Sequence, residues 1–379
     1  MRTIPMNTVP RSWRCRLGVL LLALAPALSL AADLAAIRLP PGFHIERLAS
    51  VPSARGMAWS PAGTLFVGSR SGEVWALTGY GRRGSLAVHR LAEGLAQPGG
   101  VAFREGDLYV SAVSRILRLR DIERHLAAPP APEVVSAAYP EDRAHGWKFI
   151  AFGPDGLLYV PVGAPCNVCA ANPDRYAVIT RLDVRRPAAV PEVVARGVRN
   201  SVGFDWHPRT RELWFTDNGR DRLGDDRPPD ELNRLPAGRV GAHFGFPFCH
   251  GGAVVDPDFG HQGRCADALP PARTLDAHGA ALGMRFYTGT QFPPAWRGRV
   301  FIAQHGSWNR SRKSGYRVLA ATLDAQGRVV DLLPFASGWL DEKTQQAWGR
   351  PADVSVAPDG ALLVSDDYAG AIWRISYRP

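Results

Sequence analysis

Lysine is scarce in this chain of 379 residues, and long apolar runs are absent. Lys148, Lys313 and Lys343 are the only lysines, although lysine and arginine together number 45. The formal net charge of +10 is therefore carried almost entirely by arginine, whose planar guanidinium pairs well with carboxylates. The arginines are scattered, and no basic run is flanked by stacking aromatic residues, so we expect no nucleic-acid partner. The positive charge suits an anionic ligand or cofactor.

The stretch Leu17–Leu28 is apolar but too short to span a bilayer, and no later run is long enough. It follows several arginines and precedes the small-x-small sequence Ser29–Ala31, which is typical of a secretory signal. We therefore expect residues 1–31 to be a cleaved signal peptide and the protein to be periplasmic, without stable membrane insertion. The alternative is an uncleaved membrane anchor. Loss of residues 1–31 removes four arginines and no acid, which leaves a net charge of +6.

Cysteine is also sparse, with five in the chain, one of them (Cys15) inside the expected signal peptide. The other four are Cys166, Cys169, Cys249 and Cys265. In an oxidising compartment this even number predicts two disulfides, with three possible pairings. Ala170 follows Cys169 where covalent haem attachment requires His, so that function is excluded. A zinc site formed by four sulfurs is the remaining alternative.

A repeated pattern extends along the chain after residue 31: an apolar strand, a Pro/Gly turn, and a second strand rich in Leu, Val and aromatic residues. Its six copies begin at Gly56, Gly99, Lys148, Ser201, Gly283 and Ala352. With 39 glycines and 32 prolines, the composition also favours a turn-rich β protein. The repeat predicts an all-β fold, a six-bladed β-propeller of four-stranded antiparallel blades, as a single domain over residues 32–379. A β-sandwich is the alternative. The longest interval between copies contains residues 227–280, which we expect to form loops.

The repeat also assigns the two faces of the propeller. The turn between the first two strands of each blade lies on one face, and His207 belongs to such a turn. Residues just before first strands and just after second strands meet on the opposite face. Before first strands stand Gln97, His145, Arg196, Arg199, Asn200, His278 and Arg350; after second strands stand residues 217–221, 304–310 and 365–368. Convergence of these groups around a central channel predicts a binding or active site. The turn over residues 217–226 is rich in oxygen donors of the kind that bind calcium.

At these residues the sequence resembles the soluble PQQ-dependent sugar dehydrogenases, and within them the branch named after sorbosone dehydrogenase. The resemblance covers nearly all of the chain after the signal peptide. The segments that carry it are HGWKFIAFGPDGLLYVPVGAPCNVC from His145, RGVRNSVGFDWHP from Arg196, WFTDNGRD from Trp214, DELN from Asp230 and RPADVSVAPDG from Arg350. It implies a six-bladed propeller that holds pyrroloquinoline quinone (PQQ) and calcium above the channel.

Carried over residue by residue, the resemblance implies that His145 is the catalytic base and that Arg199 stabilises negative charge at the quinone. It implies cofactor contacts for a further set of side chains: Gln97, Arg199, Asn200, Asn218, Arg350 and a basic residue of the segment 304–313, either Lys313 or Arg310. It also aligns Gly219 and Arg220 with the carbonyls that hold calcium. The sequence departs from relatives at Ala144, where some carry an acid, and at Ala352, where they carry a second arginine.

The implied function is oxidation of an aldose, a sorbosone-like compound or a related sugar hydroxy-carbonyl compound. The electrons would pass from PQQ to a quinone, a cytochrome or another redox carrier. Two alternatives remain open at this point. One is a calcium-dependent lactonase on a six-bladed propeller. The other is a carbohydrate-binding propeller without catalytic activity, which the departures at Ala144 and Ala352 would favour.

Overall fold

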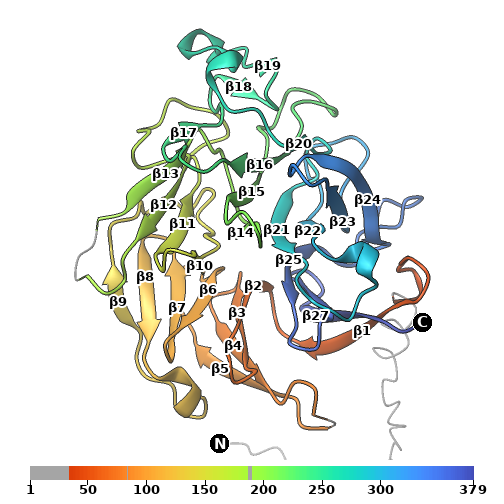
Figure 1. Cartoon of the computed structure of the whole chain (residues 1–379). Coiled ribbons are helices and arrows are strands. Elements are labelled where there is room, and N and C mark those ends of the chain that lie inside the picture. The colour runs from red at the N-terminus through yellow and green to blue at the C-terminus, as the bar shows by residue number, and fades with distance from the viewer. Residues whose placement is uncertain (1–33, 83, 187–189) are drawn as a thin grey trace, which may run out of the picture.

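Six antiparallel β-sheets surround a common centre in the computed structural model, which describes residues 34–82, 84–186 and 190–379 (Figure 1). The predicted six-bladed β-propeller is confirmed. The expected signal peptide, its cleavage site after Ala31 and Cys15 lie outside the described residues. Within them, no helix is long and apolar enough to cross a membrane.

Each of the six repeat copies forms the first two strands of a blade. Blade 1 consists of β2 (Ala54–Trp59), β3 (Leu65–Ser69), β4 (Val74–Thr78) and β5 (Ala87–Ala92). Blade 2 consists of β6 (Val101–Arg104), β7 (Asp107–Ala112), β8 (Arg115–Leu119) and β9 (Glu133–Ser136). Blade 3 consists of β10 (Ala151–Phe152), β11 (Leu158–Val162), β12 (Val178–Leu182) and β13 (Glu192–Arg196).

The second half of the ring follows the same order and closes on the N-terminal strand. Blade 4 consists of β14 (Phe204–Trp206), β15 (Leu213–Asp217), β16 (Glu231–Leu235) and β20 (Arg273–Thr274). Blade 5 consists of β21 (Ala281–Phe286), β22 (Val300–Gln304), β23 (Arg317–Leu323) and β24 (Val329–Ser337). Blade 6 consists of β25 (Pro351–Val356), β26 (Leu362–Asp366), β27 (Ala371–Tyr377) and β1 (Phe43–Ser50). Four short 3₁₀ helices lie between strands: η1 (Ile122–Arg124), η2 (Gly260–Gln262), η3 (Cys265–Asp267) and η4 (Pro294–Trp296).

The core is divided into clusters that lie between neighbouring blades. Phe66 of blade 1, for example, packs in one cluster with Val110 of blade 2, and Leu363 of blade 6 packs with Val67 of blade 1. The second strand of a blade is covered by a neighbouring blade on each side. This explains why β3 and β26 are buried along their whole length. Burial of one such side chain stabilises the fold by about 1.5–3 kcal/mol. Blade 6 is completed when β1 pairs antiparallel with β27, so the two ends of the described chain close the ring.

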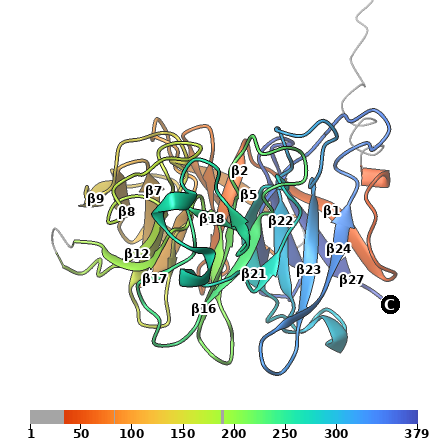
Figure 2. The ribbon, with the colours of Figure 1, turned by 90° about the horizontal axis from the view of Figure 1, so that it is seen from above.

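First strands line the centre and approach one another closely: β2 contacts β6 and β25, and β21 contacts β14 and β25. This crowding requires glycine. A Cβ atom on Gly68 would lie 2.5 Å from the carbonyl oxygen of Pro98, and one on Gly56 would lie 2.7 Å from that of Gly99. Loops gather at the two ends of the strands, as the side view shows (Figure 2).

The interval over residues 227–280 is more ordered than expected. It contains the outer strands β16 and β20 of blade 4, a strand β17 (Ala242–His243) that joins β13 in parallel, and a hairpin of β18 (Cys249–His250) and β19 (Val254–Val255). Most of these strands have only two residues, so they leave no periodic pattern that sequence reasoning can detect.

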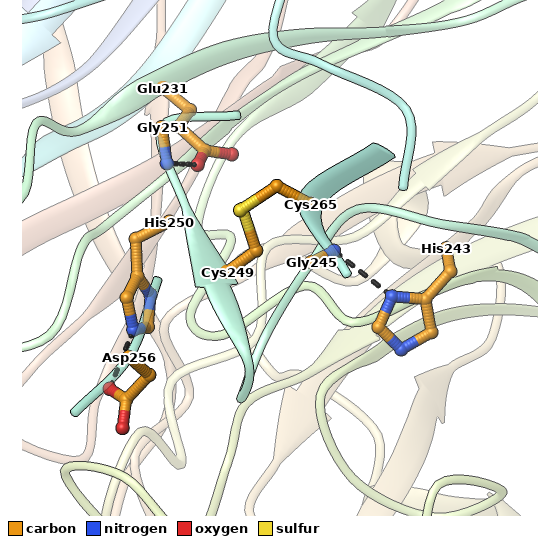
Figure 3. Close-up of a disulfide and its surroundings, with 8 residues drawn as sticks. All are labelled: Glu231, His243, Gly245, Cys249, His250, Gly251, Asp256 and Cys265. Carbon is orange, nitrogen blue, oxygen red and sulfur yellow. Dashed lines mark hydrogen bonds and ion pairs between the residues drawn. A yellow bond between two sulfur atoms is a disulfide. The ribbon is translucent and has the colours of Figure 1, made fainter. Parts of the chain in front are cut away.

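Both predicted disulfides are present, and the pairing is Cys166–Cys169 and Cys249–Cys265. The zinc alternative is therefore excluded, because all four sulfurs are paired with one another. Cys249–Cys265 joins the β18–β19 hairpin to the loop that follows it (Figure 3). Close to this disulfide, Glu231 accepts a hydrogen bond from the Gly251 amide at 2.6 Å, which attaches the hairpin to blade 4.

Candidate active site

A cavity of about 430 Å³ opens at the end of the propeller where first strands begin and second strands end. This volume lies within the range that binds cofactor-sized molecules. Of the residues to which the resemblance gives a role, six line it: His145, Arg199, Asn200, Asn218, Gly219 and Arg350. His278 and parts of the predicted segments 217–221 and 304–310 line it as well. His207 does not line it and instead borders a separate hollow beside the turn between β14 and β15. The assignment of the two faces from the repeat thus matches the structure.

Four residues to which the resemblance gives a role are not part of the cavity lining. Lys313 donates from Nζ to the Gln345 carbonyl at 2.6 Å and borders a different hollow. Gln97 lies against Gly146, and its side-chain oxygen is buried without a hydrogen-bond partner among the described residues. Arg220 directs its guanidinium to Asp256, with 2.5 Å between Nη1 and Oδ2. The other candidate for the basic residue, Arg310, binds the carbonyl of Asp225 at 2.6 Å.

His145 precedes blade 3 in a left-handed backbone conformation, with φ of 50°. Its Nδ1 lies 2.7 Å from the Ala164 carbonyl, which can only accept, so Nδ1 carries the proton and Nε2 has the free lone pair. Burial lowers the pKa of His145 to about 4, and the positive charge of Arg199 contributes to the shift. Gly163 makes this arrangement possible, because a Cβ there would lie 2.5 Å from the Cβ of His145. The imidazole is therefore a neutral base at neutral pH.

Arg199 is buried beside His145, with 4% of its surface exposed. Its Nε donates to the Asn167 carbonyl at 2.8 Å, Nη2 donates to Asn167 Oδ1 at 3.0 Å, and Nη1 donates to the Asn218 carbonyl at 3.1 Å. The nearest carboxylate oxygen, on Asp221, lies 3.7 Å from Nη2. A guanidinium has five N–H donors, so two remain for a ligand.

Buried carboxylates fix the backbone around this arginine. Asp217, at the end of β15, accepts hydrogen bonds from the amides of Arg199 and Asn200 at 2.8 and 2.6 Å. Asp230 accepts from the Gly219 amide at 2.9 Å, and burial raises the pKa of Asp230 to about 6. The backbone before β14 and after β15 is thereby held in one arrangement. We call His145, Arg199, Asn200, Asn218 and Asp221 the Arg199 side of the cavity.

A second part of the lining, which we call the Arg70 side, consists of Arg55, Arg70, Trp147 and His305. Arg55 pairs with Asp367, with 2.8 Å between Nη2 and Oδ2, and His305 Nε2 lies 2.7 Å from the other oxygen of Asp367. Burial lowers the pKa of His305 to about 4, so this imidazole is also neutral at neutral pH. The guanidinium carbons of Arg55 and Arg70 both lie 5.4 Å from the centre of the Trp147 ring.

Sequence reasoning missed Arg55 and Arg70, although the signal was present. Arg55 stands at the start of β2 and Arg70 directly follows β3, the two positions that the repeat assigns to the functional face. Arg350 completes the set of four arginines around the cavity. It donates to the carbonyls of His305 and Gly306 at 2.9 and 2.6 Å, which leaves three of its five donors for a ligand.

A metal site made of protein side chains is not apparent. Among the described residues, no group of three or more His, Cys, Asp or Glu side chains is arranged to hold an ion. Backbone carbonyl oxygens next to the cavity are the remaining candidates for metal ligands. In the described parts of the chain, no hydrogen-bond donor reaches the carbonyl oxygens of Gly219 and Arg220, whereas the carbonyl of Asn218 is bound by Arg199.

Comparison with known proteins identifies the relatives of this chain. The TrAA12-like family matches residues 187–378, which is half of the chain. The chain belongs to the TrAA12-like family. A protein of Borreliella burgdorferi, described as uncharacterized, is 31% identical over 356 residues, which cover 90% of this chain and 91% of that protein. A pyrroloquinoline quinone-dependent pyranose dehydrogenase of Coprinopsis cinerea is 30% identical over 127 residues, 29% of this chain and 17% of that enzyme.

Solved structures show the same fold in other proteins similar to this TrAA12-like chain. The holo PQQ domain of the Coprinopsis cinerea pyranose dehydrogenase has a TM-score of 0.77 at 17% identity and covers 90% of this chain and 97% of that domain. A calcium structure of an AA12 enzyme of Trichoderma reesei has a TM-score of 0.75 at 19% identity, with 90% and 97% covered. The soluble aldose sugar dehydrogenase of Escherichia coli has a TM-score of 0.67 at 18% identity, with 89% and 100% covered. The resemblance to the soluble PQQ-dependent sugar dehydrogenases, stated from the sequence motifs, is thus confirmed.

Proposed function

We propose that this protein is a PQQ-dependent dehydrogenase that oxidises an aldose, a sorbosone-like compound or a related sugar. The observation that carries the proposal is the neutral His145, with Nε2 free, beside the buried Arg199 in a cavity lined by four arginines. The relatives support the cofactor class, since the Coprinopsis cinerea enzyme is PQQ-dependent and its PQQ domain shares this fold.

The cavity residues fit PQQ, which carries three carboxylates. Arg199 and Arg350 have unused N–H donors, and Arg70 has a side chain that is half exposed and lies 3.8 Å from its nearest acidic partner. Guanidinium groups of this kind bind carboxylates strongly in a partly buried site. We assign cofactor contacts to Arg199, Asn200, Asn218 and Arg350, as the motifs imply, and add Arg55 and Arg70. Gln97 and Lys313 do not line the cavity, so we do not assign them a cofactor contact in this arrangement.

Calcium fits the donors next to the cavity. The free carbonyl oxygens of Gly219 and Arg220 are hard neutral ligands of the kind that calcium accepts. Asp221 and Asp230 line the same part of the cavity and supply negative charge to a cation. We propose that these two carbonyls hold the ion and that ligand oxygens complete its coordination.

Bound PQQ would supply the acceptor for the two electrons that leave the sugar carbon. His145 removes the hydroxyl proton of the sugar, because its Nδ1 is occupied by Ala164 and the lone pair of Nε2 is free. Burial keeps His145 neutral, and the charge of Arg199 adds to this effect. Arg199 would also place a fixed positive charge where negative charge develops. Because the partners of Arg199 are already in place, no reorganisation is needed during the reaction.

A lactonase is less well supported. Such a site needs calcium held by grouped carboxylate and amide side chains, and residues 34–82, 84–186 and 190–379 contain no group of three or more acidic, His or Cys side chains placed for it. Four arginines around a histidine have no role in that chemistry. The non-catalytic alternative shares the cavity with the dehydrogenase, so turnover must separate the two.

The direct experiment is dye-linked oxidation of a panel of sugars by the apoprotein reconstituted with PQQ and calcium. We expect oxidation of at least one aldose or sugar hydroxy-carbonyl compound, dependent on both additions. Lactone hydrolysis without PQQ would support the lactonase instead. PQQ binding without oxidation of any sugar would support the binding protein, and the absence of both would overturn the proposal.

We further propose that the protein acts in the periplasm and delivers electrons to a quinone, a cytochrome or another carrier. Two disulfides within the described residues suit an oxidising compartment, as does the signal-like N-terminal sequence. Cell fractionation with the intact chain tests this placement. Recovery of the uncleaved chain in the cytoplasm would contradict it.

A further inference from the structure

The segment Cys166–Cys169 contributes nothing to the cavity lining, yet it contacts the central arginine. Its disulfide closes a loop of four residues, all of them half-buried, which residues 163–165 separate from β11. Asn167 lies inside this loop. It belongs to blade 3, whereas Arg199 and Asp221 belong to the segments on either side of the first two strands of blade 4.

Asn167 uses its side chain and its carbonyl in four hydrogen bonds. It accepts two from Arg199, at 2.8 Å on the carbonyl and 3.0 Å on Oδ1. Oδ1 also accepts from the Asp221 amide at 2.8 Å, and Nδ2 donates to the Asp221 carbonyl at 3.2 Å. The amide group of one side chain therefore joins the arginine before β14 to the acidic residue after β15.

Asn167 accounts for two of the three hydrogen bonds of the Arg199 guanidinium. Loss of the side chain removes the bond to Oδ1, so that two carbonyl acceptors remain for Arg199, that of residue 167 at 2.8 Å and that of Asn218 at 3.1 Å. It also removes both hydrogen bonds to Asp221, because Oδ1 and Nδ2 make them, so the carbonyl of residue 167 is no longer held against blade 4. A buried arginine that loses one acceptor, while a second acceptor is less firmly held, is less stabilised and less fixed in orientation.

We propose that Asn167 is a positioning residue that holds Arg199 against His145, and that the Cys166–Cys169 disulfide keeps Asn167 in place for this. The proposal deepens the function given above and rests on it for the catalytic consequence. Its geometric part does not depend on PQQ. Reduction of this disulfide would accordingly weaken turnover by releasing Arg199, although neither cysteine lines the cavity.

The first test uses the pKa of His145, measured without cofactor, to report whether Arg199 keeps its position. The charge of Arg199 contributes to the low pKa of His145, so loss of Arg199 from this place raises that pKa. The experiment is an NMR titration of the histidine Cε1–H signals in the full chain, with the His145 signal assigned from its absence in His145→Asn. Asn167→Ala should raise the pKa of His145 toward the value of an exposed histidine, about 6.5.

Asn172→Ala is the matched control. Asn172 lies on the exposed part of the connection between β11 and β12, and among the described residues its Oδ1 accepts only from the Asp174 amide. This control should leave the His145 titration unchanged. Asn167→Gln keeps a neutral amide group with both an acceptor and a donor, so it should stay closer to the wild type than Asn167→Ala. It also serves as the test variant if Asn167→Ala does not fold, with a smaller upward shift expected. An unchanged His145 titration in every folded Asn167 variant would overturn the proposal.

The second test measures kcat and KM of the enzyme reconstituted with PQQ and calcium. Asn167→Ala should lower kcat by about 10- to 100-fold, the usual effect of losing a group that orients a catalytic residue, with a smaller change in KM. Cys166→Ser/Cys169→Ser should do the same in weaker form, whereas Cys249→Ser/Cys265→Ser, which removes the other disulfide, should not change the His145 titration. A wild-type kcat in the folded Asn167→Ala variant would contradict the catalytic part. If no variant and no wild type oxidises sugar, the shift of His145 still decides the geometric part, so the two failures are distinguishable.

Discussion

Arg199 and Arg70, on the two sides of the cavity, are held in different ways. Arg199 has 5% of its side chain exposed and gives three hydrogen bonds to fixed carbonyl and amide oxygens. The side chain of Arg70 is 49% exposed, and its nearest carboxylate oxygen lies 3.8 Å away. A buried guanidinium with most donors in use keeps one orientation, whereas an exposed one adapts to its ligand. Under the proposed function, we expect Arg199 to supply fixed catalytic geometry and Arg70 to supply attraction for an anionic group.

The sharpest way to test this division is to remove the base of the Arg199 side. His145→Asn is preferable to His145→Ala, because φ is 50° and asparagine tolerates the left-handed conformation. We expect kcat to fall by about 1,000-fold, since general-base catalysis is lost, while PQQ affinity changes little. His207→Asn, on the other face, is the control and should retain wild-type turnover. Equal turnover in the two variants would remove His145 from the proposed chemistry.

Loss of the fixed arginine should have the next largest effect. Arg199→Met removes a buried positive charge next to the reacting group, and we expect kcat to fall by about 100-fold. Stopped-flow measurement of quinone reduction separates this effect from slow product release. If reduction proceeds at the wild-type rate in this variant, the electrostatic role of Arg199 is wrong.

The pH dependence of the free enzyme follows from the same side of the cavity. The pKa of His145 is lowered to about 4, so the histidine is deprotonated and competent as a base above that pH. We expect kcat/KM to lose about a factor of ten per pH unit only below that value, rather than below the 6.5 of an exposed histidine. Asp230, whose pKa is raised to about 6, faces the same cavity, and Asp230→Asn identifies its separate contribution. An acid limb at pH 6.5 that persists in Asp230→Asn would contradict the assignment.

The smallest effect is expected on the Arg70 side. Arg70→Met removes an exposed charge, and exposed charge pairs contribute about 0.2–1 kcal/mol, so PQQ affinity should fall by no more than about fivefold. The loss should shrink as salt is added, because exposed charges are screened. Isothermal calorimetry at two salt concentrations measures both. A loss of PQQ affinity well above this, or one that added salt does not reduce, would contradict the role given to Arg70.

The fold was predictable because the repeat is long and regular. Six copies of one strand–turn–strand pattern define the blades and, by strand direction, the face on which His145, Arg199 and Arg350 meet. The same rule applied to blade 1 would have found Arg55 and Arg70.

Other parts of the site depend on loop conformation, which a sequence pattern does not encode. Asn167 and Arg199 are 32 residues apart, and their contact arises from a loop shaped by a disulfide. The direction of Lys313 is set by Gln345, on a loop of another segment. The guanidinium of Arg220 points to Asp256 in the insertion between β16 and β20, where short strands leave no periodic signal.

The central claim, that the arginines around this cavity bind a tricarboxylate quinone beside His145, is tested most directly by an absorbance titration with PQQ in the presence of calcium. The wild-type chain should bind one equivalent with a saturable spectral change, and Arg199→Met/Arg350→Met, with its folding checked by circular dichroism, should lose that change. Equal binding by both chains, or none by the wild type, would contradict the account.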